Sequence, residues 1–267
     1  MNPTIFSSVI NSYLPEPHAA LLNGIIFGLN LSSTPKFYQQ LKIVGLLHMV
    51  VLSGMNIAIL GAVVGSIIPF VSKRISCLIT ILIIIFFIYF VGAQAPIIRA
   101  GFMGILTLVA VIYGRQVTAI YLLLLSAIFI GIFWPSWLKS LSFYLSYGAT
   151  LGMIIFGNKE PYKGSNYINS VVYNLKKELK TTLAAQIFTV PMIFIYFHQL
   201  SLISPIANVL ISFLIPPLMV FGFLTAFLGK INFYLGLPFS YICYGILTYI
   251  IWIIEKLSEM PFIFIQF

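Results

Sequence analysis

A short apolar segment holds the side chains best suited to chemistry in this chain. His48 brings an imidazole that can gain or lose a proton, and Ser53 and Asn56 bring a hydroxyl and an amide. Between them, Gly54 leaves the backbone without a covering side chain. Polar groups without partners cost several kcal/mol in an apolar medium, so these residues are expected to face a bundle interior or a pathway. A kinked helix in which His48 hydrogen-bonds to a neighbour is the structural alternative.

Further polar side chains lie at intervals along other apolar stretches. Arg99 could hold a phosphate through two parallel N–H bonds, or it could extend its charge toward water. Ser142, Ser146 and Thr150 are spaced by four residues and share one helix face, as a polar lining or helix packing requires. Asn208 precedes a pair of prolines that would interrupt its helix. The candidate pathway residues, which we expect to meet at one polar cavity, are His48, Ser53, Gly54, Asn56, Arg99, Ser146 and Asn208.

The elements that position these residues are membrane-spanning helices. Hydrophobic residues make up 61% of the chain and charged residues 7%, which leaves too little polar surface to cover a soluble globule. Several apolar runs reach the ~20 residues that cross a bilayer as a helix. We expect an all-α, polytopic membrane bundle of about eight transmembrane helices, some broken or kinked around a polar pathway. The expected spans are 43–70, 75–93, 96–114, 117–134, 140–157, 181–197, 203–228 and 237–254.

These spans divide the chain into three parts. Residues 1–42 contain only short apolar pieces and are expected to form an interfacial or re-entrant segment. Residues 43–254 form the transmembrane domain, and residues 255–267 form a C-terminal tail. The first span, 43–70, would be roughly 42 Å long as a straight helix, well beyond a hydrocarbon core of ~30 Å. We therefore expect it to break at the Ser-Gly pair in its middle.

The basic residues of the connections indicate the orientation in the membrane. Placing connections on alternate sides gathers most of them on one side: Lys73, Arg74, Arg115, Lys159, Lys163, Lys176, Lys177, Lys180 and Lys230. The opposite side receives Lys36, Lys42, Lys139 and Lys256. By the positive-inside rule, the 158–180 loop is cytoplasmic and both termini lie outside the cell membrane. The same bias accounts for the net charge of +9, and anionic lipid headgroups are the next candidate partners of these lysines.

Enzymatic activity finds little support in the sequence. The chain contains no aspartate, and its glutamates lie outside the expected spans, which excludes carboxylate dyads and carboxylate metal sites from the membrane interior. His48 and Ser53 are five positions apart and point away from each other in a regular helix, which disfavours a serine–histidine pair. No nucleotide-binding loop occurs. We therefore expect no enzyme activity and no cofactor.

Four segments, in order along the chain, resemble the competence domain of ComEC-type proteins, the inner-membrane channel for DNA uptake in natural transformation. Residues 48–57 (HMVVLSGMNI) resemble the family motif HLLA[I/V]SGLH[I/V]. Residues 95–103 (APIIRAGFM) are similar to its RAxxM stretch, and residues 144–152 (YLSYGATLG) to its LSFxATxG stretch. Residues 191–208 resemble its later region of spaced Pro, Phe, Ser and Asn.

The resemblance, which extends from Leu21 to Leu228, implies a channel or permease that takes up single-stranded DNA across the inner membrane. Asn56 stands where the family has its second motif histidine, so hydrogen bonding rather than protonation is expected there. The oligonucleotide-binding and metallo-β-lactamase-like domains of full-length members match no part of this sequence. A nuclease and a cytoplasmic motor would then come from other proteins. The alternatives are a small-solute or lipid transporter and a membrane scaffold without a pathway.

Overall fold

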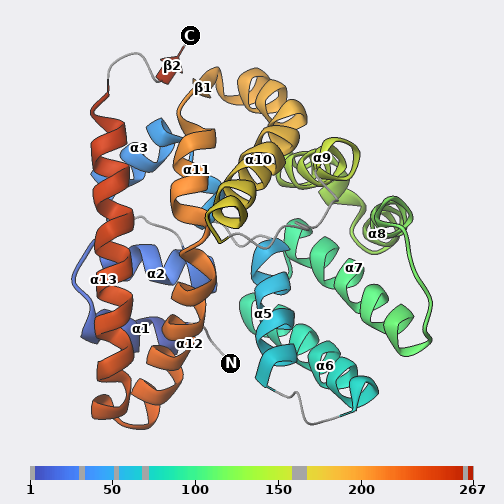
Figure 1. Ribbon diagram of the computed structural model, residues 1–267, viewed down its shortest axis with the longest axis horizontal. Helices are drawn as coiled ribbons and strands as arrows, with labels where there is room; N and C mark the ends of the chain where they lie inside the picture. Colours follow the sequence, from blue (N-terminus) through green and yellow to red (C-terminus); the bar gives the residue numbers. More distant parts are fainter. Residues whose placement is uncertain are drawn as a thin grey trace.

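Apolar runs separated by glycine, proline and charged residues fold into a series of helices (Figure 1). The computed structural model describes residues 4–29, 34–50, 54–67, 72–157, 167–260 and 264–266. The helices and strands of these residues, in chain order, are α1 (Thr4–Tyr13), α2 (His18–Phe27), α3 (Pro35–Val44), α4 (Leu47–Val50), α5 (Gly54–Ile67), α6 (Lys73–Val91), α7 (Ala95–Ile112), α8 (Ala119–Phe133), η1 (Pro135–Lys139), α9 (Leu141–Phe156), α10 (Tyr167–Phe197), β1 (Gln199–Ser201), α11 (Ser204–Ser212), α12 (Ile215–Ile231), α13 (Phe233–Ser258) and β2 (Phe264–Gln266).

The expected polytopic helical membrane fold is confirmed. Among the described residues, α6, α7, α13 and the part of α10 from Tyr173 onward are each long and apolar enough to cross a bilayer. α11 and α12 meet the same test together, but they bend by 53° at the break between them. α8 and α9 are apolar but have only 15 and 16 residues. The expected number of about eight full crossings therefore includes shorter and broken helices.

The expected loop 158–180 is wrong over much of its length. α10 begins at Tyr167, so the polar residues 167–180 form the start of a 31-residue helix. This segment contains leucine, lysine and glutamate, which are strong helix formers. Their charge indicated contact with water, and that was mistaken for the absence of regular structure.

The first expected span, 43–70, is divided into pieces. α3 ends at Val44, and Gly45 follows it in a left-handed conformation with φ 77°. α4 is a single turn of four residues, and α5 begins at Gly54. The break expected at the Ser-Gly pair falls on residues 51–53, which include Ser53 and lie outside the described residues, and on Gly54 at the first described position of α5.

Helices from the two ends of the chain build the larger apolar core. α1, α2 and α3 pack against α12 and α13, so the first and last segments lie side by side (Figure 1). α2 lies inside this group, and every residue from Ala19 to Phe27 is buried. α12 approaches α2 closely because it carries Gly222 at the contact, where a side chain would collide with Ile26. The expected interfacial or re-entrant segment thus places one of its helices in the interior.

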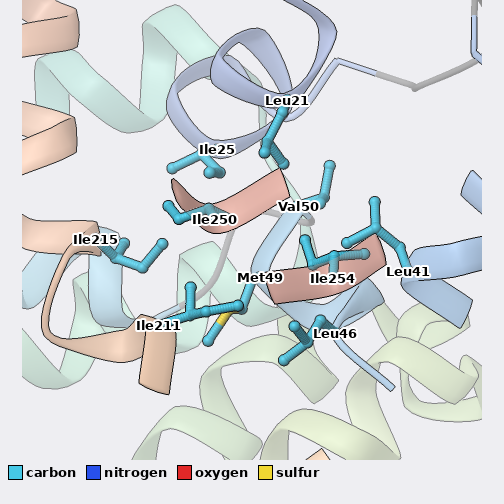
Figure 2. A pocket seen from close by; sticks show the side chains of 10 residues that line it. All are labelled: Leu21, Ile25, Leu41, Leu46, Met49, Val50, Ile211, Ile215, Ile250 and Ile254. Atoms are coloured by element: carbon cyan, nitrogen blue, oxygen red, sulfur yellow. The ribbon is translucent and has the colours of Figure 1, made fainter. Parts of the chain in front are cut away.

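The short helix α4 is anchored in this core by one of its sides. Figure 2 shows Met49 and Val50 among apolar side chains from α2, α3, α11, α12 and α13. They surround a void of about 10 Å³, which is at most the space of one water molecule, and its apolar lining favours an empty space. With Met49 and Val50 held in the core, His48 is left on an exposed side of the turn.

A second group of helices follows in the middle of the chain. α5, α6 and α7 pack around the buried side chains Ile57, Ile84, Phe87 and Ile97. α8 packs on α7, and α9 packs on α7, α8 and α10. α10 also contacts α11, so it links this group to the first one. The strand β1 that follows α10 pairs antiparallel with β2, which places part of the expected C-terminal tail in a two-stranded ribbon.

Candidate functional site

Arg99 is a buried cation in the second helix group. It lies near the start of α7 and is only 8% exposed. Its Nη1 donates a hydrogen bond to the hydroxyl of Thr150 in α9. That hydroxyl donates in turn to the carbonyl oxygen of Ser146 at 2.9 Å, which leaves a lone pair directed at the arginine. A polar contact therefore joins α7 to α9.

Gly54 lies against the same guanidinium. A Cβ atom at this position would lie 3.0 Å from Nη2 of Arg99 and 3.2 Å from Cβ of Ala100. These distances are shorter than ordinary van der Waals contact, so a side chain would push α5 away from α7. The absence of a side chain lets α5 start beside the cation. The structure thus brings Gly54 and Arg99, both predicted from the sequence, into contact.

Tyr147 covers the guanidinium from α9. The Cζ atom of Arg99 lies 5.9 Å from the centre of the Tyr147 ring, which is within the range of a cation–π interaction. The phenol oxygen of Tyr147 lies 2.8 Å from the hydroxyl of Ser126 in α8. This hydrogen bond fixes the ring, so helices α5, α7, α8 and α9 all contribute to the surroundings of Arg99.

The charge of Arg99 has no carboxylate beside it. The salt bridge found among the described residues is Lys256–Glu259, an exposed pair at the C-terminal end of α13. The Nε atom of Arg99 is buried and has no hydrogen-bond partner among the described residues. A buried cation without a compensating charge is costly, and an anion bound beside it removes that cost. The arrangement is therefore suited to hold a passing anionic group such as a phosphate.

A second polar group surrounds the turn at Gly45. The exposed His48 has its Nδ1 atom 3.1 Å from the carbonyl oxygen of Gly45, to which it donates. The amide of Asn208 in α11 lies close enough to His48 to interact with its imidazole. Asn208 donates through Nδ2 to the hydroxyl of Thr182 in α10, 2.6 Å away. His48 and Asn208, both predicted, are thus brought together across two helices.

The same turn is held by the start of α11. Ser204 donates to the Gly45 carbonyl oxygen at 3.4 Å and accepts from Nε2 of Gln186 at 3.3 Å. A Cβ atom on Gly45 would lie 2.8 Å from Cβ of Ser204 and 2.9 Å from Cβ of Ser201. Its positive φ also strains any other residue. Glycine is therefore required here both by conformation and by the close approach of the serines.

The remaining predicted residues have other surroundings. Asn56 is 3% exposed, and its amide donates to the carbonyl oxygen of Ile25 in α2 at 3.0 Å. Ser146 is half-buried and its backbone carbonyl, rather than its side chain, contributes to the Arg99 group. Ser142 is exposed. Of the described residues expected at one cavity, Gly54, Arg99 and Ser146 form one group, His48 and Asn208 form a second, and Asn56 lies apart from both.

Ser126, Thr182 and Ser204 contribute to these groups and were not predicted as site residues. Each is a small hydroxyl residue within an apolar helix, a type that commonly bonds to its own helix backbone. Ser126 does so as well, donating to Leu123, which shows why its type alone carries little information. Their partners in other helices could be found only from the packing.

The His48–Asn208 contact can be tested by a double-mutant cycle. We expect His48→Ala and Asn208→Ala each to lower the free energy of unfolding by about 1 kcal/mol, because each removes one partner of the same polar interaction. The double variant should lose clearly less than the sum of the two. Thermal unfolding of the purified protein measures this, with Ser142→Ala as a control for an exposed hydroxyl. Additive losses would show that the two side chains act independently.

Both polar groups lie in a region of the chain that matches a known protein family. The sequence profile described as "Competence protein" matches residues 25–267, which include Arg99, His48 and all of their described partners. The chain belongs to the Competence protein family. Membership confirms the resemblance predicted from the four motif segments, and it supports a role in competence.

One curated Competence relative is ComE operon protein 3 of Bacillus subtilis (strain 168). It is 24% identical to this chain over 205 residues. The match covers 76% of this chain and 25% of the relative, so the chain corresponds to about a quarter of that protein. No solved structure matches the chain.

Proposed function

We propose that this protein is a channel or permease through which single-stranded DNA crosses the bacterial inner membrane toward the cytoplasm. The observation that supports it best is Arg99, a buried cation with an unpartnered Nε and no carboxylate beside it in the described structure. A chain of phosphates supplies the missing negative charge, one group at a time. Because the charge is fixed among helices, it attracts a polyanion without holding it through many contacts.

The second polar group is assigned to the same route. His48, Asn208 and Thr182 join α4 to α10 and α11, next to the turn at Gly45 where α3 ends. Irregular backbone at membrane depth is stable where it lines a cavity or is enclosed by protein, and transporters place substrate sites at such breaks. The exposed His48 and the half-buried Asn208 can bind the polar edges of a strand during passage.

The strand is driven and processed by other proteins in this proposal. A nuclease outside the membrane would supply single strands, and a cytoplasmic motor would pull them, since the sequence has no nucleotide-binding loop. Anionic lipid headgroups are the proposed partners of the basic residues at the cytoplasmic end.

The orientation gives a direct prediction. With the basic residues cytoplasmic and both termini outside, a Lys163→Cys variant should resist membrane-impermeant thiol reagents in intact cells and react after the cells are opened. A cysteine introduced at Lys139, on the opposite side, serves as the matched control and should react in intact cells. Rapid labelling of Lys163→Cys in intact cells would reverse the proposed orientation.

Deleting the gene and following labelled DNA tests the function itself. The deletion strain should bind DNA at its surface, yet it should fail to bring single strands into the cytoplasm and should lose transformation. Restoring the gene should restore both. Normal DNA entry in the deletion strain would refute the proposal and favour a small-solute or lipid transporter. Loss of such a transporter would give the deletion strain a nutrient or lipid defect, whereas loss of a scaffold would not.

A further inference from the structure

Two aromatic rings stack on α9 next to the buried cation Arg99, and together they form an aromatic column. Phe143 and Tyr147 are one helical turn apart, with ring centres separated by 4.1 Å and planes inclined by 26°. Tyr147 lies next to Arg99, whose Cζ atom is 5.9 Å from the ring centre. Phe143 lies in the first turn of α9, Tyr147 follows one turn later, and Arg99 of α7 lies beside Tyr147. Both rings are half-buried, so each retains a surface that a ligand can reach.

The orientation of the column is fixed by polar contacts at its inner end. The hydroxyl of Ser126 lies 2.8 Å from the Tyr147 phenol, and the hydroxyl of Thr150 accepts a hydrogen bond from the Arg99 guanidinium. Neither contact occupies the outer ring, Phe143. A rigid aromatic face next to a cation is the combination that single-stranded nucleic acid binders use, because bases stack on rings while phosphates pair with the cation.

We propose that Phe143 and Tyr147 form a stacking site for the bases of single-stranded DNA, next to the arginine that pairs with its phosphates. This inference rests on the proposed function and specifies how a single strand is recognised. In a duplex the bases are already stacked and paired, so their faces are not available to the rings. The column therefore favours a strand with free bases over a duplex and over anions without bases.

A second ring pair in the protein offers a matched comparison. Phe86 and Phe90, also one turn apart, stack on α6 with centres 6.3 Å apart. Phe86 is 55% exposed and lies on a helix that is long and apolar enough to span the membrane. Phe90 is buried in the larger core, whereas Phe86 faces outward as lipid-facing aromatics do. Phe86→Leu therefore removes an exposed ring that lies away from Arg99.

The test compares two probes with equal numbers of phosphates. Purified protein in detergent is titrated with fluorescent oligothymidylate of about 12 nucleotides and with an abasic strand of the same length. Wild type should bind oligothymidylate at least tenfold more tightly. Phe143→Leu and Tyr147→Leu should reduce this ratio toward one without weakening the abasic strand, whereas Phe143→Trp, Tyr147→Phe and Phe86→Leu should preserve it.

Other outcomes separate this inference from the proposed function. Equal binding of the two probes by wild type, or an unchanged ratio in both leucine variants, overturns the stacking site while leaving an anion pathway standing. A parallel loss for both probes in Phe143→Leu also overturns it, because the ring would then act through the arginine or the fold. Binding of neither probe by a folded wild type overturns the DNA pathway together with the stacking site.

Discussion

Uptake of single-stranded DNA is expected to fall about 100-fold when Arg99 is replaced by alanine, the loss typical of one strong charge-assisted contact. The guanidinium is a buried charge with no carboxylate beside it among the described residues, and its truncation leaves a phosphate without a partner. Labelled-DNA entry in a strain carrying the variant at normal membrane levels measures the effect. Arg115→Ala, which removes an exposed arginine, is the control and should change uptake little. Wild-type uptake by a well-inserted Arg99→Ala protein would remove Arg99 from the site.

Two further variants separate charge, geometry and stability. Arg99→Lys should recover only part of the uptake, because an ammonium cannot make two parallel bonds or stack as a plane on Tyr147. Full recovery would mean that a positive potential is sufficient. Arg99→Met should lose uptake yet unfold at the same temperature as wild type or higher, since it removes a buried charge that nothing nearby compensates. A strongly destabilised Arg99→Met would instead assign the arginine a structural role.

A methyl group on Gly152 should lower the stability of the bundle by about 1–3 kcal/mol, and a leucine there should prevent correct folding. A Cβ atom at this position would collide with the backbone oxygen of Ala184 in α10, which cannot move without shifting that helix. Thermal unfolding and size-exclusion profiles in detergent measure the effect. Because α9 also carries Tyr147 and Thr150, DNA uptake should fall with stability.

Gly245 in α13 provides the matched control for this substitution. A Cβ atom there would meet nothing within 4 Å, so Gly245→Ala costs no packing and improves helix propensity. It should therefore be neutral or stabilising by up to about 1 kcal/mol. Equal behaviour of Gly152→Ala and Gly245→Ala would mean that α9 and α10 are less closely packed than the structure describes.

The sequence was most informative about single residues and least informative about their partners. Arg99 and His48 were recognisable because a charged or titratable side chain in an apolar run needs a reason. Their contacts could not be predicted: Thr150 lies 51 residues from Arg99, and Ser204 lies 159 residues from Gly45. Such pairings depend on which helix faces meet, and hydropathy describes only how apolar each helix is.

Some helix boundaries could be predicted from the sequence, and others could not. α6 and α7 follow closely from long apolar runs, because length and composition are sufficient for a membrane span. The start of α10 was missed because residues 167–180 are polar, although their helix propensity is high. The place of α2 was left open because a ten-residue apolar helix is equally consistent with an interface and with a buried position.

The enclosure of α2 sets an order of assembly. Its buried residues, Ala19 to Phe27, are covered by α12 and α13, which are synthesised well after it. Ten residues are too few to hold a helix across the bilayer, so α2 must stay at the membrane surface or against other proteins during synthesis. The larger core is complete only after α13 has packed against α2. A chain truncated before α13 would leave the apolar surface of α2 exposed to incorrect contacts.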